Sequence, residues 1–298
     1  MIRAAAIGLF AAAVIAAGCS SDRADVRESP WTRIAATLRP GLDPASPNPC
    51  NGGQRRCIDA VIAEMSRRLD GLAACDHHGP FALMYLRVTE AVREDGADLD
   101  DTERAYVSHL DAVFAQLYFE AFDGWAEGRD ESLPAAWRVA FDAAERRRVS
   151  GIGNLLLGMN AHISRDLPYA VAAIGTATKI DEKRSFDGVN VVLGRVAEPM
   201  LAEAAERFDP TIAAFRLPVL EIDQRTVSSL LGRWRDDAFR DAQRLLEAET
   251  AGSRAAVEAS IEDKAAWRAA LVVAATSRVS FSDAGKARDR HCERQAPD

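Results

Sequence analysis

Residues 150–168 read SGIGNLLLGMNAHISRDLP, and this stretch decides the fold. Its large apolar side chains recur every three or four residues, which is the spacing of side chains on one face of an α-helix. The spacing predicts a helix that begins near Ser150 and buries this face. The members of the apolar stripe are Ile152, Leu155, Leu156, Met159 and Ile163.

The rest of the chain repeats this pattern. A short helix is expected after Leu133-Pro134, because proline is favoured at the first position of a helix. Glycine and proline separate the stripes, and no segment shows the alternation of a half-buried strand. We therefore predict an all-α fold, a single bundle of about seven to ten helices. The further helical stripes lie within 58–69, 81–92, 106–118, 186–200, 227–245 and the alanine-rich segment 254–276.

Two polar residues interrupt the apolar face of the helix that begins near Ser150. His162 follows Met159 by three residues, and Asp166 follows His162 by four, so both side chains are expected to point into the bundle. Burying such groups is costly unless they are paired. The imidazole and the carboxylate either hydrogen-bond as a structural pair or share a metal ion, and the sequence leaves both readings open.

The same test selects further candidates on other helices. His109 lies between Tyr106 and Val113 on an inward face, and Asn190 lies on the core side of the stripe within 186–200. Metal ligands are expected among His162, Asp166, His109 and Asp187, which together allow at most one or two divalent ions. The candidate catalytic residues are Asn160, His162, Asp166 and Asn190.

The first nineteen residues resemble the signal of a bacterial lipoprotein. Arg3 precedes the unbroken apolar stretch 4–17, which is too short for a permanent membrane span, and small residues lead directly to Cys19. The resemblance implies cleavage before Cys19 and lipidation of its thiol, whereas an ordinary secretory signal is the competing interpretation. We expect a signal peptide at 1–18, a flexible lipid-anchored tether at 19–55 and an all-helical domain at 56–298.

The charge of the chain excludes one class of partner. The formal net charge is −8, and removing Arg3 with the signal peptide makes the mature chain −9. Nucleic-acid binding needs clustered cations, so we expect no nucleic-acid partner. The expected contact is with a membrane through the N-terminal lipid, outside the cytoplasmic membrane, while a protein or small-molecule partner stays open. Nor does the chain contain a GxSxG, GxxxxGK[ST] or HExxH motif.

The cysteine count agrees with an exported protein. Besides Cys19 there are four cysteines, which suggests two disulfides with three possible connectivities. We favour Cys50–Cys57, because the intervening Asn-Gly-Gly can turn tightly, and Cys75–Cys292 then remains. Zinc is the competing explanation, although the regular Cys/His spacing of a zinc site is missing.

Several stretches are similar to a bacterial family of all-helical proteins of unknown function. The family is typified by Gly-Met-Asn-Ala-His-Ile-x-x-Asp-Leu, which residues 158–167 match, and the similarity covers roughly 56–280. It implies an all-helical fold and a polar site without naming a reaction. Further similar stretches are 76–89, 108–119, 134–143 and the Asp-x-x-Asn step within 184–190. The site residues that the resemblance implies are Asn160, His162, Asp166, His109, Asp187 and Asn190.

These observations favour a lipid-anchored binding or scaffold protein of the cell envelope with a buried His/Asp network. The alternative is a metal-dependent hydrolase that uses His162 and Asp166. The His-x-x-x-Asp step is also similar to that of secreted all-helical zinc phospholipases and nucleases, but the five histidines of this chain are too few for a three-zinc cluster.

Overall fold

The computed structural model describes residues 29–96, 99–175, 182–213, 224–280 and 283–295. Side chains at 182–187, 224–228, 278–280 and 283–285 lie outside this description. All regular elements of the described residues are helices, which confirms the all-α prediction. The α-helices are α1 (Pro30–Thr37), α2 (Arg56–Asp70), α3 (Gly79–Asp95), α4 (Asp101–Ala126), α5 (Ala135–Glu145), α6 (Gly151–Asn160), α7 (Leu167–Ile174), α8 (Glu182–Arg207), α9 (Gln224–Glu247), α10 (Ala251–Ser280) and α11 (Asp283–Gln295). The short elements are η2 (Asp130–Ser132), η3 (Ala161–Asp166) and η4 (Pro210–Ile212).

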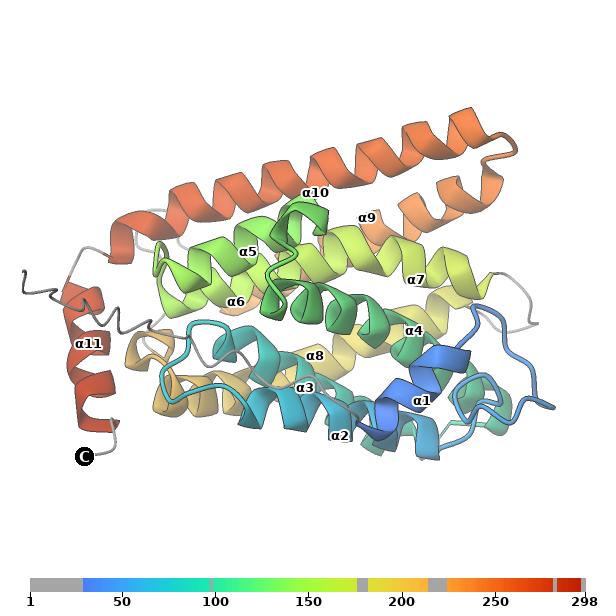
Figure 1. Cartoon of the computed structure of the whole chain (residues 1–298), viewed down its shortest axis with the longest axis horizontal. Coiled ribbons are helices and arrows are strands. Elements are labelled where there is room, and N and C mark those ends of the chain that lie inside the picture. The colour runs from blue at the N-terminus through green and yellow to red at the C-terminus, as the bar shows by residue number, and fades with distance from the viewer. Residues whose placement is uncertain (1–28, 97–98, 176–181, 214–223, 281–282, 296–298) are drawn as a thin grey trace, which may run out of the picture.

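A continuous rod made of α6, η3 and α7 runs through the middle of the bundle (Figure 1). The α9–α10 hairpin covers one side of this rod, and α2, α3 and α8 form the other side (Figure 1). α11 stands across one end of the bundle, while α1 lies near the other end (Figure 1). We call the rod the central helix; it spans residues 151–174.

The central helix is buried on all sides, because nearly every residue from Gly151 to Ile174 is inaccessible to solvent. Its start follows from the Ser150 side chain, which accepts a hydrogen bond from the N–H of Gly153 at 3.3 Å. Gly158 allows the close approach of α3, because a Cβ at this position would lie 2.3 Å from Cγ of Phe81. Burial of this kind explains why polar side chains on the central helix need partners from several neighbouring helices.

The middle of the central helix is a π-helix, η3. The N–H of Leu167 donates to the carbonyl of His162, five residues earlier instead of four. Pro168 follows directly; it has no N–H to donate and its ring would clash with the carbonyl of Ser164 in a regular α-helix. The wider turn therefore accommodates the proline, and it contains both His162 and Asp166.

Residues 29–55 pack on the bundle, so the predicted tether at 19–55 is wrong over this range. Trp31 of α1 is 4% exposed, and its ring contacts the ring of Phe119 edge-on with 5.4 Å between the centroids. Asn51 donates to the carbonyls of Arg39 and Gly41 and fixes the loop after α1. A proline-rich composition favours extended chain, but these specific long-range contacts dock the segment.

Both disulfides that the sequence favoured are present. Cys50–Cys57 closes the loop before α2, and Cys75–Cys292 joins the segment before α3 to α11 across 217 residues of chain. The second bond holds α11 against the end of the bundle. None of the described helices is long and apolar enough to cross a membrane.

Candidate functional site

His162 and Asp166 meet inside the bundle, as their spacing predicts. Nδ1 of His162 lies 3.1 Å from Oδ2 of Asp166, and both side chains are almost fully buried. Trp137 of α5 donates its indole N–H to the same carboxylate oxygen at 2.8 Å, and Arg165 donates to Oδ1 at 3.0 Å. A second bond from Arg165 to Glu262 links this network to α10. Asp166 therefore holds three helices in register and fixes the orientation of the imidazole.

The imidazole of His162 lies in a cluster of aromatic rings. Phe114 of α4 stacks on it at 3.5 Å between centroids, with 9° between the planes, and Tyr85 of α3 lies 4.3 Å away. Phe81 and Tyr118 approach it edge-on at about 6 Å. Asp166 occupies Nδ1, so the proton resides on that nitrogen and Nε2 keeps a free lone pair.

A small cavity lies beside this ring, with a volume of about 90 Å³. We call it the inner cavity; His162, Tyr85, Thr89 and Asp111 contribute its polar wall, and apolar side chains of α3, α4, α7 and α8 complete it. Four buried atoms of this wall make no hydrogen bond within ordinary distance and angle limits among the described residues, although the Thr89 hydroxyl lies close enough to Asp111 to lower the pKa of its carboxyl. They are Nε2 of His162, the Tyr85 hydroxyl, Oγ1 of Thr89 and Oδ2 of Asp111. Arg235 of α9 adds a cation to the lining. Such a gathering of unsatisfied polar atoms is rare in native proteins and needs an explanation.

Burial disfavours the charged forms of three ionisable side chains in the cavity wall, those of Asp111, His162 and Tyr85. Burial raises the pKa of Asp111 to about 7, and the nearby Thr89 hydroxyl offsets part of the rise. Burial lowers the pKa of His162, although the hydrogen bond that the ring donates to Asp166 opposes this shift. Burial and then the charges of Asp111 and Asp166 raise the pKa of Tyr85 well above 10. The wall therefore offers a lone pair at His162 and hydroxyl groups at Tyr85 and Thr89, and Asp111 changes from a protonated to an ionised carboxyl as the pH rises through about 7.

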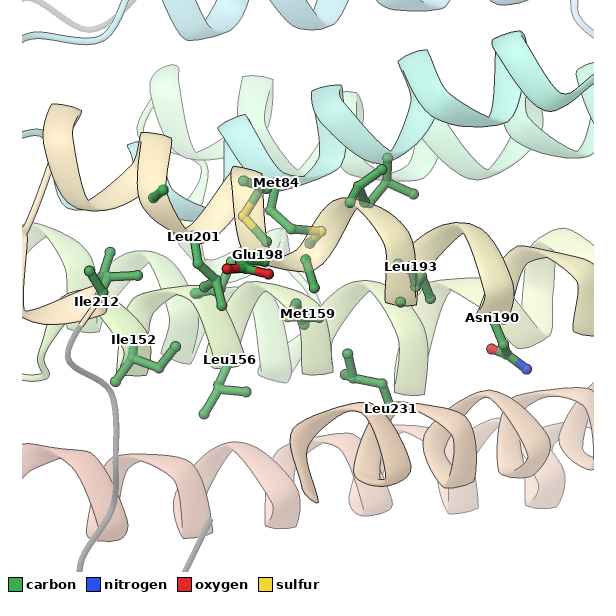
Figure 2. Close-up of a pocket in the computed structure, with 18 of the residues that line it drawn as sticks. Met84, Ile152, Leu156, Met159, Asn190, Leu193, Glu198, Leu201, Ile212 and Leu231 are labelled. Atoms are coloured by element: carbon green, nitrogen blue, oxygen red, sulfur yellow. The ribbon is translucent and has the colours of Figure 1, made fainter. Parts of the chain in front are cut away.

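An apolar groove adjoins the inner cavity. Figure 2 shows it between α8, α6 and α9, with Met84 and Leu201 on one side and Ile152 and Leu156 on the other. Its volume is about 440 Å³, and Asn190 and Glu198 are the polar side chains among its described lining residues. Met84, Val88, Met159 and Leu193 line both the groove and the inner cavity, so the two hollows meet along these side chains.

The other predicted site residues lie elsewhere or contact other partners. His109 is fully buried, but its two ring nitrogens lie 2.9 and 2.7 Å from the carbonyl oxygens of Cys50 and Pro40. It fastens the N-terminal segment and does not join His162, so its prediction as a shared metal ligand is wrong. Asn160 donates to the carbonyl of Ala265 at 2.8 Å and ties α6 to α10.

Asn190 and Asp187 both belong to α8. Asn190 lines the groove, outside the lining of the inner cavity (Figure 2). The side chain of Asp187 lies outside the described residues. Among the side chains that are described, no three from His, Cys, Asp and Glu are placed to hold a metal ion. Since Asp166 already accepts hydrogen bonds at both oxygens, the described part of the predicted metal-ligand set does not assemble.

Three polar members of the inner cavity were not among the residues predicted from the sequence. Tyr85 and Thr89 are one turn apart on α3, in a row with Phe81, and were concealed within an apolar stripe. Asp111 precedes Phe114 by three residues, so helical spacing alone would have placed it on the inward face of α4. The partnership of Trp137 with Asp166 has no such signal, because it depends on how α5 packs on the central helix.

Comparison with known proteins assigns the sequence to one family. No match was found among curated proteins or among solved structures. The model of a family described as "Family of unknown function (DUF5995)" matches residues 58–275, which include every described residue named in the wall of the inner cavity and most of the bundle. The chain belongs to this family of unknown function.

Proposed function

We propose that the protein is a lipid-anchored protein of the cell envelope that binds a small molecule in the inner cavity. The cavity carries the proposal, because four polar atoms face it or lie beside it without a hydrogen bond of ordinary geometry in the described structure. Leaving a buried donor or acceptor unsatisfied costs about 1–3 kcal/mol. A ligand that supplies hydrogen bonds to these atoms would recover that free energy, and binding would follow from it.

Native mass spectrometry of the mature chain tests this proposal. Gentle transfer is expected to show a mass in excess of the polypeptide and its lipid, and the replacement Asp111→Leu is expected to abolish it. Asp142→Leu makes the same substitution at a partly exposed carboxylate outside this cavity and provides the control, which should keep the excess mass. The proposal would be contradicted if native mass spectrometry showed no excess mass and a crystal structure of the same protein showed only ordered water in the cavity.

The envelope location rests on the N-terminal signal, and its test is separate. Cells grown with labelled palmitate are expected to incorporate label into the protein, and Cys19→Ala is expected to prevent this. The acyl chains would place the inner cavity close to a membrane surface. An unlabelled wild-type protein released into the medium would overturn the anchor while leaving the cavity proposal intact.

A second function, hydrolysis, is favoured by the orientation of His162. An imidazole whose Nδ1 is fixed by a carboxylate and whose Nε2 is free has the arrangement of a general base. It would take a proton from water as the water attacks an ester carbon, and return it to the leaving oxygen. The test is hydrolysis of p-nitrophenyl butyrate, which should be lost in His162→Gln. Equal rates for the variant and the wild type would leave binding as the function.

A further inference from the structure

We infer that the ligand of the inner cavity is a single-chain amphiphile, with its aliphatic chain in the apolar groove and a small oxygen-bearing head in the inner cavity. This inference rests on the proposed binding function and adds the class of ligand. It follows from the contact between the aliphatic groove, which Figure 2 shows, and a smaller cavity whose wall carries buried polar atoms of His162 and Tyr85 that make no hydrogen bond among the described residues.

The groove has the size and chemistry of a site for an aliphatic chain. Its volume of about 440 Å³ lies within the roughly 300–1,000 Å³ that is usual for small-molecule sites. The described lining is aliphatic apart from Asn190 and Glu198, and it contains no aromatic ring that would favour a flat ligand. Dispersion contacts along aliphatic walls suit a flexible chain.

The junction between the hollows is adaptable. Two of the four shared lining residues, Met84 and Met159, have unbranched thioether side chains that change rotamer readily. They face the groove from α3 and α6, as Figure 2 shows for both residues. A narrow chain can therefore pass between them, whereas a branched or ring-shaped molecule would require the helices to separate.

The inner cavity selects the head group. Its volume of about 90 Å³ is what about three waters occupy in the liquid, at about 30 Å³ each, which is too small for the glycerol phosphate of a two-chain phospholipid. Nε2 of His162 accepts a hydrogen bond, and the hydroxyls of Tyr85 and Thr89 donate or accept. A hydroxyl or carboxyl head that both donates and accepts can satisfy these atoms together.

Charge distinguishes the two possible head groups, a carboxyl and a hydroxyl. Around the cavity the described titratable and charged groups are Tyr85 of α3, Tyr106 and Asp111 of α4, His162 and Asp166 of the central helix, and Arg235 of α9. A carboxyl head would be drawn to Arg235 and repelled by an ionised Asp111, whereas an alcohol is indifferent to both. Fatty alcohol and fatty acid therefore form separate arms of the experiment.

Equilibrium dialysis with the chain carrying Cys19→Ala tests the inference, since this chain has no acyl group of its own to compete. The probes are dodecan-1-ol, dodecanoic acid, dodecane and butan-1-ol. Dodecanol is expected to bind at least about a hundredfold more tightly than butanol, because each further buried methylene adds to binding. It is expected to bind about tenfold more tightly than dodecane, which lacks the hydrogen bonds of the head.

A pair of leucine substitutions separates the groove from the cavity. Leu201→Gln places a polar group in the groove only and is expected to weaken dodecanol about tenfold while leaving butanol unchanged. Leu246→Gln, at a leucine that is 43% exposed on α9, is the matched control and should change neither. Circular dichroism confirms that both variants fold.

The results test the position of the chain, the nature of the head group and the binding function separately. Equal affinities for dodecanol and butanol would overturn the chain in the groove but keep the cavity as a binding site. Equal affinities for dodecanol and dodecane would overturn the assignment of the head. Failure of all four probes to bind, with no excess mass in native mass spectrometry, would overturn the proposed function itself.

Discussion

Replacing Asp111 by asparagine is expected to stabilise the protein at neutral and higher pH. Burial raises the pKa of this carboxyl from 3.8 to about 7, although the residue as a whole is only partly buried. Between these values the folded state binds a proton that the unfolded state has released. The free energy of unfolding therefore falls as the pH rises from about 4 to 7, and the full cost remains at higher pH.

The size of the effect follows from the shift. One pKa unit corresponds to about 1.36 kcal/mol, so the cost of ionising Asp111 in the wild type has a limit of about 4 kcal/mol above pH 7. Asp111→Asn removes this pH-dependent part. The new amide adds a constant cost of about 1–3 kcal/mol if its N–H groups stay unsatisfied, and that cost is the same at every pH.

Urea unfolding of both proteins at about pH 4 and about pH 8, followed by circular dichroism, measures the effect. The stability difference between variant and wild type should move in favour of the variant by about 2–4 kcal/mol between the two pH values. Asp142→Asn is the control, because Asp142 is partly exposed and paired with Arg146 and Arg148 on the surface. A change for Asp111→Asn below about 1 kcal/mol, or in the opposite direction, would refute the account of the cavity as a desolvated site.

Three further outcomes are expected. Asp166→Ala should lower the free energy of unfolding by about 3–5 kcal/mol in urea titrations, because it leaves buried donors without their acceptor. Replacing both Cys75 and Cys292 by serine should cost about 2–4 kcal/mol and hasten proteolysis near α11, whereas an unchanged digestion pattern would show that other contacts hold this helix. Gly158→Ala should lower the free energy of unfolding by about 1–3 kcal/mol through its clash with Phe81, and the melting temperature should fall accordingly. A higher melting temperature would show that α3 and α6 can separate freely.

The helices could be predicted because each carries its own signal. Apolar spacing placed the central helix, and Pro134 marked the beginning of α5 where the structure has it. The packing of residues 29–55 could not be predicted in this way, because it depends on single contacts with distant helices, such as that of Trp31 with Phe119. Composition describes the average behaviour of a segment and contains no information about such contacts.

Only the part of the site that lies on a single helix could be predicted from the sequence. Because side chains three and four residues apart share a face, the inward orientation of His162 and Asp166 followed from the sequence. The same rule turned His109 inward correctly but could not say which neighbour it would meet. Its partners are the carbonyls of Cys50 and Pro40, and the docking of the loop between α1 and α2 decides this. The polar wall was missed for another reason, because Tyr85 and Thr89 lie within an apolar stripe.

The geometry of the His162–Asp166 pair depends on the number of residues in the π-helical turn that contains it. Loss of a single codon between His162 and Asp166 would restore the i→i+4 bonding of an ordinary α-helix, because the π-turn holds one residue more than an α-turn. The helix after it would keep nearly the same orientation, so α7 would still pack on α9. His162 and Asp166 would then be three residues apart instead of four, and the carboxylate would meet the ring from a different direction.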